Sequence, residues 1–236
     1  MAGKASPMGK RRPEHGAAAR AKCARPDPVH FIRTHMRIAP VPAVPEVSLY
    51  TAHSGSGLSR LGDPADAELS APYWAFPWSG GMALARHILD RREIVADRRV
   101  LDLGAGSGLV AIAAAMAGAS EVTAADIDPY ALAAIALNAA ANGVKVHAIA
   151  ARLEGEPPPA TDLILAGDLY YDRALAARVT PYLERCLASG IAILIGDPGR
   201  TYLPLSHLRL VGEYQVPDIG VANAEAKPSA VYAFEA

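Results

Sequence analysis

Residues 100–108 read Val-Leu-Asp-Leu-Gly-Ala-Gly-Ser-Gly, and this stretch decides the fold. The first four residues are apolar except for Asp102, which predicts a buried strand. The three glycines that follow predict a turn too tight for side chains, and the apolar run from Leu109 to Ala117 predicts a helix. A strand, a glycine turn and a helix in this order place bare backbone at the carboxyl end of a parallel strand, where a ligand can approach closely.

The residues around the turn exclude two common classes of ligand site. A phosphate-binding loop usually carries Lys after its last glycine, whereas this turn continues with Leu109, and no Lys or Arg lies between Arg99 and Lys145. The spacing Gly-x-Gly-x-Gly also differs from the Gly-x-Gly-x-x-Gly of dinucleotide binders. We therefore expect a ligand that presents no pyrophosphate here, and the alternative is a tight turn without a ligand.

A second predicted strand, Val122–Asp126, ends in an acid about 20 residues beyond the turn, the distance at which nucleoside-binding α/β domains place the carboxylate that accepts ribose hydroxyls. Asp126 is therefore a candidate ribose ligand, and the alternative is that it only ends the strand. Asp128 is better explained as the N-cap of the next helix, because Pro129 follows at the first helical position.

The rest of the chain alternates predicted strands and helices, which indicates an α/β domain. Pro181 is expected to kink or split the helix that Asp172 caps. We expect further strands over residues 145–150, 162–168 and 191–196, and a closing hairpin of 209–216 with 230–234.

Composition limits the class of protein. The 236 residues suffice for one α/β domain with an N-terminal extension, and a net charge of −1 argues against a general nucleic-acid binder. Cys23 and Cys186 lie far apart, which predicts neither a disulfide framework nor a metal cluster and is typical of a reducing compartment. No apolar run reaches the ~20 residues that cross a bilayer.

The N-terminal part divides into a tail and an extension. Residues 1–28 are basic and poor in apolar side chains, so we expect disorder. A basic arm for an acidic partner and an Arg-rich targeting peptide are the alternatives, whereas a secretory signal lacks its apolar segment. Three prolines predict extended, edge-like segments over 29–50. We expect 29–70 to pack on an α/β domain formed by 71–236.

Two further motifs indicate the rim of a ligand crevice. Residues 72–81, Pro-Tyr-Trp-Ala-Phe-Pro-Trp-Ser-Gly-Gly, hold both tryptophans and predict a ligand wall, an aromatic cluster that closes the core, or both. Residues 168–171, Asp-Leu-Tyr-Tyr, follow a predicted strand at its carboxyl end, where open α/β sheets bind ligands.

Together these motifs resemble those of the seven-strand S-adenosylmethionine-dependent methyltransferases. Residues 101–108 look like the first motif of that family, and Asp126 looks like its ribose-binding acid. The chain resembles most the branch of protein-lysine methyltransferases that modifies the electron transfer flavoprotein β subunit, at residues 29–47, 72–81, 122–129, 137–143 and 196–200. The resemblance covers 29–235 and implies an α/β, Rossmann-like seven-stranded sheet with helices on both faces and an antiparallel last strand.

The resemblance implies a protein-lysine N-methyltransferase that uses S-adenosyl-L-methionine and acts on the electron transfer flavoprotein β subunit or a ribosomal protein. We expect a cytoplasmic monomer, with no metal, nucleic acid or membrane involved. The glycines are expected to contact the methionine part of the cofactor, Asp102 its ammonium group unless it only braces the loop, and Trp78 to cover it. The implied catalytic residues are Asp168 and Tyr171, and the implied cofactor-binding residues are Trp78, Asp102, Gly104, Gly106, Ser107, Asp126, Ile127 and Asp168.

The implied roles at the substrate end follow from the chemistry of an amine nucleophile. A lysine has a pKa of ~10.4 in water, and a neighbouring carboxylate raises this value further. Asp168 is therefore expected to orient the amine or to collect its proton. Tyr171 occupies the family motif's Tyr position and is the preferred pocket residue, with Tyr170 as a packing residue in the alternative.

The chain departs from the family pattern at two places. Tyr170 stands where the family usually has Phe, which keeps an aromatic ring but adds a hydroxyl group, so we expect a difference in substrate preference. Where many methyltransferases hold the adenine amino group with an acid, this chain reads Ala150-Ala151-Arg152, and Glu154 is the nearest candidate. The adenine contact is therefore left open.

Several other classes of protein share parts of the pattern. A short-chain dehydrogenase needs Tyr-x-x-x-Lys, and the tyrosines at 170, 171 and 182 are followed four positions later by Ala, Leu and Cys. A ribosomal-protein methyltransferase of the L11-methylating type normally carries a separate N-terminal domain, for which 70 residues hardly suffice. A small-molecule N-methyltransferase and a cofactor-binding scaffold without activity are the remaining alternatives.

Overall fold

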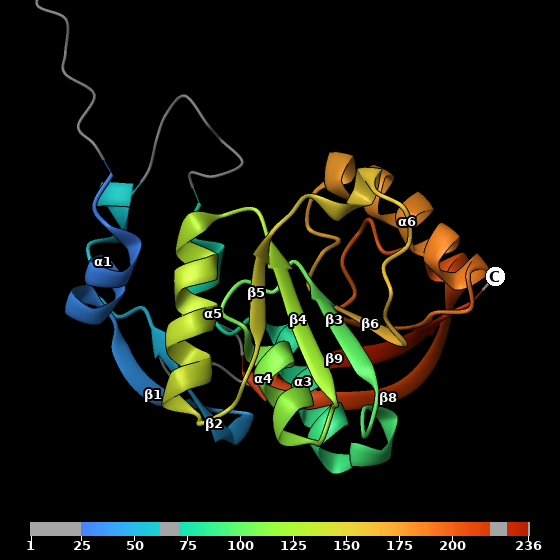
Figure 1. The fold of residues 1–236 in the computed structure, drawn as a ribbon, viewed down its shortest axis with the longest axis horizontal. Helices are drawn as coiled ribbons and strands as arrows, with labels where there is room; N and C mark the ends of the chain where they lie inside the picture. The colour runs from blue at the N-terminus through green and yellow to red at the C-terminus, as the bar shows by residue number, and fades with distance from the viewer. Residues whose placement is uncertain (1–24, 62–70, 218–225, 236) are drawn as a thin grey trace, which may run out of the picture.

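The computed structural model describes residues 25–61, 71–217 and 226–235. Its centre is a seven-stranded sheet in the order β5-β4-β3-β6-β7-β9-β8 (Figure 1). Strand β9 is antiparallel to both β7 and β8, and the other neighbours are parallel. The expected Rossmann-like sheet with an antiparallel last strand is thus confirmed. The strands are β3 (Arg99–Leu103), β4 (Glu121–Asp126), β5 (His147–Ala150), β6 (Leu163–Gly167), β7 (Ala192–Asp197), β8 (Leu208–Pro217) and β9 (Ala226–Phe234).

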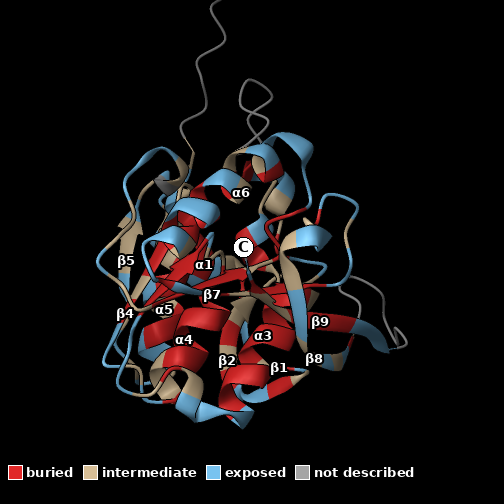
Figure 2. Ribbon diagram, turned by 90° about the vertical axis from the view of Figure 1, so that its right-hand side faces the viewer, coloured by how far each residue is buried: buried red, intermediate tan, exposed pale blue. Residues whose placement is uncertain are grey.

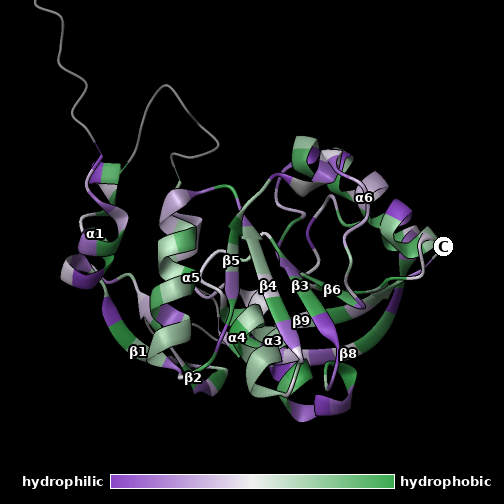
Figure 3. Ribbon diagram, viewed as in Figure 1, coloured by the Kyte–Doolittle hydropathy of each residue, from purple (hydrophilic) through white to green (hydrophobic). Residues whose placement is uncertain are grey.

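Helices cover both faces of the sheet, as expected. Helices α3 (Ser79–Asp90), α4 (Leu109–Met116) and α5 (Pro129–Ala141) lie on one face, and α6 (Arg173–Ala188) lies on the other (Figure 1). Most of α3 and α4 is buried, whereas α6 exposes its outer side (Figure 2). Helix α6 accordingly mixes hydrophilic and hydrophobic residues along its length (Figure 3).

Strand β3 shows how the sheet separates two cores. Successive side chains point to opposite faces of a strand. Val100 therefore joins the cluster under α3 and α4, whereas Leu101 and Leu103 join the cluster under α6. Asp102 shares the face of Val100 and meets the first turn of α4. Burial on both faces explains why this strand reads as an apolar run.

The turn after β3 requires its glycines. Gly104, Gly106 and Gly108 have φ values of 67°, 52° and 80°, in the left-handed region that side chains disfavour. A Cβ atom on Gly104 would also overlap the Leu169 side chain, which follows β6. The prediction of a turn too tight for side chains is confirmed.

The N-terminal extension begins with a helix, where the sequence predicted extended chain. Helix α1 spans Pro28–His35, and the prediction of extended segments is wrong there. Asp27 caps the helix by accepting a hydrogen bond from His30 N (2.8 Å), and proline at the first helical position favours helix. Phe31 is buried and meets the Tyr130 ring of α5 edge-on.

The rest of the extension is a two-stranded hairpin, β1 (Arg37–Val41) with β2 (Val44–Thr51), outside the main sheet. Asn138 of helix α5 and its C-cap residue Asn142 bind the hairpin: Asn142 accepts from Ser48 N (2.9 Å), and Asn138 accepts from Tyr50 N (2.8 Å). Short 3₁₀ turns follow at Leu58–Leu61 and Tyr73–Ala75. The expected tail lies outside the described residues over 1–24, and the division into tail, extension and catalytic domain stays a prediction.

The helix boundaries follow local signals with one exception. Asp128 caps α5 by accepting from Tyr130 N (2.9 Å), and Asp172 caps α6 by accepting from Leu175 N (2.9 Å), both as predicted. Pro181 does not split α6, because the helix runs through it unbroken, and a kink there stays a prediction. Pro181 itself is exposed, while Val179 and Tyr182 anchor both sides of it in the core. Among the described helices, none has the length and apolar character that a bilayer crossing needs.

Candidate active site

A cleft of about 340 Å³ opens at the carboxyl ends of β3, β4 and β6, the edge at which open α/β sheets bind ligands. Ligand sites commonly measure about 300–1,000 Å³, so the volume suits a nucleoside-sized molecule. Asp102 and Ser107 lie instead in a smaller cavity of about 50 Å³, which shares several lining residues with the cleft. The cleft brings together most of the predicted site residues: Trp78, Gly104, Gly106, Asp126, Ile127, Asp168 and Tyr171.

Asp126 braces the glycine turn from the neighbouring strand. Its Oδ2 accepts a hydrogen bond from Gly106 N (2.8 Å), and its Oδ1 accepts one from Asp128 N (3.0 Å). A carboxylate has about four acceptor sites, so beside these backbone donors it can still accept a hydrogen bond from a ligand hydroxyl group. Burial raises the pKa of this carboxyl, and the backbone donors oppose that rise.

Asp102 lies beneath the turn and is 1% exposed. Its Oδ2 accepts a hydrogen bond from Ala111 N (3.0 Å) in the first turn of α4. Burial raises the pKa of Asp102 to about 7, although the Ala111 N–H opposes the rise. The structure therefore shows the bracing contact, while a contact with a ligand ammonium group stays a prediction.

The tryptophan segment forms both a wall and a core cluster. Trp78 lines the cleft, and its indole N–H donates to the Tyr73 carbonyl (2.7 Å). Trp74 is buried and stacks on Tyr130 with ring centroids 5.8 Å apart. Trp78 therefore forms the predicted ligand wall, and Trp74 forms the predicted aromatic cluster of the core.

Tyr73 connects the wall to the opposite side of the cleft. Its ring centroid lies 5.8 Å from that of Trp78 and 5.1 Å from that of Tyr171, and all three residues line the cleft. Tyr170 is instead buried in the core under α6. Of the two neighbouring tyrosines, Tyr171 is therefore the one placed at the cleft, as preferred from the sequence.

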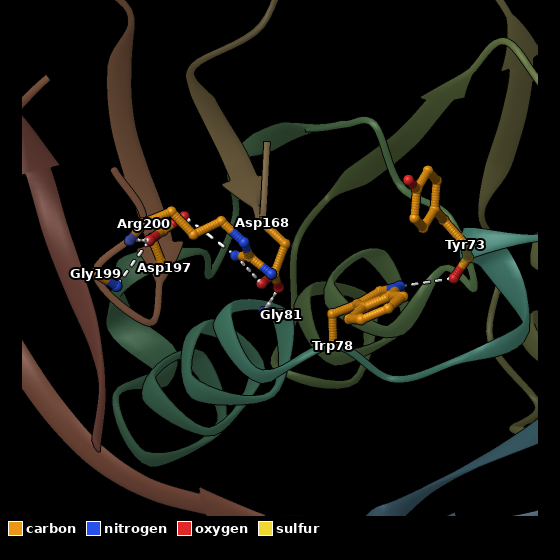
Figure 4. A network of polar contacts seen from close by, with 7 residues as sticks. All are labelled: Tyr73, Trp78, Gly81, Asp168, Asp197, Gly199 and Arg200. Atoms are coloured by element: carbon orange, nitrogen blue, oxygen red, sulfur yellow. Dashed lines mark hydrogen bonds and ion pairs between the residues drawn. The ribbon is translucent and has the colours of Figure 1, made fainter. Parts of the chain in front are cut away.

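Asp168 lies at the end of β6 in a left-handed backbone conformation, with φ 59°. Its Oδ2 accepts a hydrogen bond from Gly81 N (2.6 Å) in the first turn of α3, and its Oδ1 pairs with Nη1 of Arg200 (2.5 Å) (Figure 4). Burial raises the pKa of this carboxyl, and the Arg200 guanidinium opposes the rise. The site thus holds Asp168 from two directions.

Two glycines allow α3 to approach the sheet so closely. A Cβ atom on Gly80 would overlap the Gly196 carbonyl, and one on Gly196 would overlap the Gly80 carbonyl. This contact of bare backbones brings Gly81 N within reach of Asp168, where the positive end of the helix dipole favours a carboxylate.

Sequence reasoning did not assign site roles to Arg200 or Tyr73. A signal for Arg200 was present, because residues 196–200 follow a predicted strand at the same edge of the sheet. Gly167 pairs with Gly196 in the ladder of β6 and β7, so the residues after each strand lie side by side. Glu154, the candidate for the adenine contact, does line the cleft, where its Oε1 pairs with Arg178 Nε (3.2 Å). Its role stays a prediction.

The residues of the cleft fit S-adenosylmethionine. The glycine turn presents bare backbone, the Asp126 carboxylate has free lone pairs for ribose hydroxyls, and the Trp78 ring lies along the wall. No Lys or Arg follows the turn to bind a phosphate group.

Comparisons with known proteins agree with this fit. A family model for ribosomal protein L11 methyltransferase (PrmA) matches residues 83–171. The chain is 39% identical over 215 residues to the electron transfer flavoprotein beta subunit lysine methyltransferase of Xenopus laevis, covering 88% of this chain and 87% of that protein. It is 42% identical over 156 residues to the human protein of the same name, covering 62% of this chain and 58% of that protein.

The chain is also similar to a more distant relative and to a solved structure. The homolog from Caenorhabditis elegans is 30% identical over 187 residues, covering 72% of this chain and 75% of that protein. The crystal structure of TrmN from Thermus thermophilus has a TM-score of 0.50 at 24% identity, covering 65% of this chain and 48% of that one, and this likeness shows the fold alone. The chain is an S-adenosylmethionine-dependent methyltransferase, and it belongs to the family of electron transfer flavoprotein beta subunit lysine methyltransferases.

Proposed function

We propose that this enzyme methylates lysine side chains of the electron transfer flavoprotein β subunit, the substrate that its relatives' names give. The observation that carries the proposal is the position of Asp168. Its carboxylate is buried, and Asp168 lines the same cleft as the aromatic rings and the glycine turn. An amine that enters from the open side would meet this carboxylate.

S-adenosylmethionine supplies, when bound, a methyl group on a sulfonium that is already activated for displacement. The chain's own residues then have to hold the nucleoside, position the amine and exclude water. We assign the holding role to the backbone of Gly104 and Gly106 and to the Asp126 carboxylate, with Ser107 and Ile127 flanking them. Asp102 keeps the turn in place from below, and Trp78 covers the cleft from the side.

Asp168 has the geometry to orient the amine. Its two oxygens are fixed by Gly81 and Arg200, so the carboxylate presents its remaining lone pairs in a defined direction. A carboxylate raises the pKa of a neighbouring lysine, so Asp168 does not make the amine more acidic. It instead accepts a hydrogen bond from the amine and stabilises the positive charge that develops on nitrogen as the new bond forms.

The aromatic residues offer a second interaction to the positive charge on the amine. Tyr73 and Tyr171 touch at the mouth of the cleft, beside Trp78. Aromatic faces attract ammonium groups, and they continue to do so after each added methyl group has removed a hydrogen-bond donor. We assign Tyr171 to the lysine channel for this reason.

A ribosomal protein is the second candidate substrate. The family model for ribosomal protein L11 methyltransferase matches residues 83–171, which hold the glycine turn and Asp126. These residues serve the cofactor end, so the match supports the shared reaction more than a ribosomal substrate. We further infer that the enzyme is a monomer, works in the cytoplasm and binds no nucleic acid. The net charge of −1 supports the last point, and the cysteine spacing, which suggests no disulfide framework, supports a reducing compartment.

The test uses purified enzyme, methyl-labelled S-adenosylmethionine, and two substrates offered in parallel: electron transfer flavoprotein and ribosomal proteins. We expect label on lysine in the β subunit, located by mass spectrometry, and none in a reaction with Asp168→Ala. Label on the ribosomal proteins with an unlabelled β subunit would reverse the assignment. Light scattering on a sizing column measures the oligomeric state in the same preparation.

A further inference from the structure

Arg200 lies between two buried acids at the edge of the cleft. Its Nη1 pairs with Asp168 Oδ1 (2.5 Å) and lies 3.3 Å from Asp197 Oδ2 (Figure 4). Arg200 also lines the cleft, with a side chain that is 22% exposed. It therefore joins the substrate end of the site to the end of β7.

Asp197 fixes the chain that carries Arg200. Its side chain is fully buried, and its Oδ1 accepts hydrogen bonds from Gly199 N (2.8 Å) and Arg200 N (2.7 Å). Two backbone donors satisfy this oxygen, so the turn after β7 is ordered independently of the guanidinium. The turn that brings the guanidinium to the Asp168 carboxylate thus has hydrogen bonds of its own.

We infer that Arg200 is a positioning residue for methyl transfer, which aims the Asp168 carboxylate into the cleft and keeps it ionised. The inference rests on the proposed function, because it takes Asp168 as the residue that receives the amine. Beyond that function, Arg200 is the group that sets the direction and the ionisation of the Asp168 carboxylate.

The charges around Asp168 explain why it needs such a partner. The first turn of α3 offers backbone N–H groups but no cation, and the carboxylates of Asp102 and Asp126 line adjoining parts of the same site. The turn after β7 adds Arg200 together with Asp197. Burial raises the pKa of Asp168, and the guanidinium heads the groups that lower it.

The first test measures the protonation of Asp168 directly. Carboxyl carbon NMR of aspartate-labelled enzyme, titrated with S-adenosylhomocysteine present, follows the Asp168 signal, which Asp168→Asn assigns. An opposite charge at this distance lowers a carboxyl pKa by about one to three pH units, so we expect Arg200→Met to raise the pKa of Asp168 by at least about one. Arg200→Lys keeps a charge but loses the planar fork, and we expect a smaller rise.

The matched control is Arg86→Met on α3. Arg86 pairs with Glu46 and Asp90, its side chain is also 22% exposed, and it does not line the cleft. A general effect of removing a paired arginine would appear in this variant, in which we expect the pKa of Asp168 to stay unchanged. If Arg200→Met fails to fold, Arg200→Gln keeps hydrogen-bond donors without the charge and carries the same expectation.

The second test is the pH dependence of kcat/KM with the β subunit. A requirement for neutral lysine and ionised Asp168 gives a slope of two on a logarithmic plot below the pKa of Asp168 and a slope of one above it. We expect Arg200→Met to move this break upward by the same amount as the NMR value. An unchanged NMR titration in Arg200→Met overturns the inference even if methylation proceeds. A shifted titration in an enzyme that methylates no lysine overturns the proposed function instead.

Discussion

Asp126 and Asp168 close neighbouring parts of one cleft, and the structure holds them in different ways. Asp126 ends β4 and is held by backbone N–H groups within its own segment and the glycine turn. Asp168 follows β6 and is held by a helix N-terminus and by a side chain from the turn after β7. The first carboxylate belongs to a local motif, whereas the second depends on groups 87 and 32 residues away.

This difference corresponds to two tasks of the enzyme, which are binding the cofactor and positioning the substrate. A carboxylate held by backbone keeps its place whatever the neighbouring side chains are, which suits a cofactor common to many methyltransferases. A carboxylate held by a guanidinium can be tuned in charge and direction by one side chain. We therefore expect changes at Asp168 to affect turnover and changes at Asp126 to affect cofactor affinity.

The largest expected effect tests the substrate side. Asp168→Ala should reduce kcat/KM by at least about 100-fold, because removing one group that stabilises developing charge costs about 10²–10³-fold. The affinity for S-adenosylhomocysteine, measured by calorimetry, should remain within the same order of magnitude. Asp172→Asn is the control, since Asp172 is exposed four residues away and Asn also caps helices well. Unchanged turnover in Asp168→Ala would refute the assigned role.

The next effect tests the cofactor side. Asp126→Ala should raise the Kd for S-adenosylhomocysteine by at least about 10-fold, because a hydrogen bond to a charged group contributes about 1.5–3 kcal/mol. Glu121→Gln, at the exposed start of the same strand, should leave the Kd unchanged. If Asp126→Ala lowered kcat at saturating cofactor and left the Kd alone, the contrast between the two carboxylates would be lost.

A third, smaller effect uses Asp102, the acid beneath the turn. Its pKa is 3.8 in the unfolded chain and about 7 in the fold, so the folded state binds more protons than the unfolded state between these values. Stability from this group is therefore full below about pH 4 and lost as the pH rises toward 7, by up to ~1.4 kcal/mol per pH unit.

Urea unfolding of the ligand-free enzyme at several pH values measures this dependence. Asp102→Asn should show a flatter decline than the wild type between pH 4 and 7. The difference between the two proteins isolates Asp102 from Asp126 and Asp168, whose carboxyl pKa values burial also raises. Parallel curves would mean that Asp102 stays ionised in the fold.

The smallest effect concerns the aromatic mouth of the cleft. Tyr171→Leu should raise the KM for the β subunit about two- to fivefold, because a partly exposed cation–π contact contributes about 0.5–1 kcal/mol, whereas Tyr171→Phe should keep most of the affinity. Tyr202→Leu is the control: Tyr202 is 42% exposed, close to the 44% of Tyr171, and does not line the cleft. Equal effects at both positions would assign the loss to general surface change.

The sequence predicted those parts of the site that adjacent residues determine. The glycine turn, Asp126 and the caps at Asp128 and Asp172 follow from short-range rules of backbone and capping, and their placement was right. Arg200 was missed as a site residue because its contact with Asp168 arises from the pairing of β6 with β7. No local pattern contains that pairing, although the strand order of the fold would have given it.

In the N-terminal extension, by contrast, the prediction was wrong although a local signal was present. Its prolines suggested extended chain, which is right for β1 and β2 but wrong for α1. Asp27 and Pro28 form a helix start of the same kind as Asp128 and Pro129, so a local signal for α1 is present in the sequence. The burial of Phe31 against α5, which helps to hold α1 in place, could not be foreseen from the extension alone.

The contact between Gly80 and Gly196 sets a boundary for redesign of this enzyme. Each residue already has the smallest side chain available, so neither can shrink to accommodate growth of the other, and a change at one cannot be compensated at its neighbour. A library that randomises the substrate end can therefore be centred on Tyr73 and Tyr171. It should leave this pair fixed, since even a single methyl group there would lift the start of α3 and carry Gly81 away from its carboxylate.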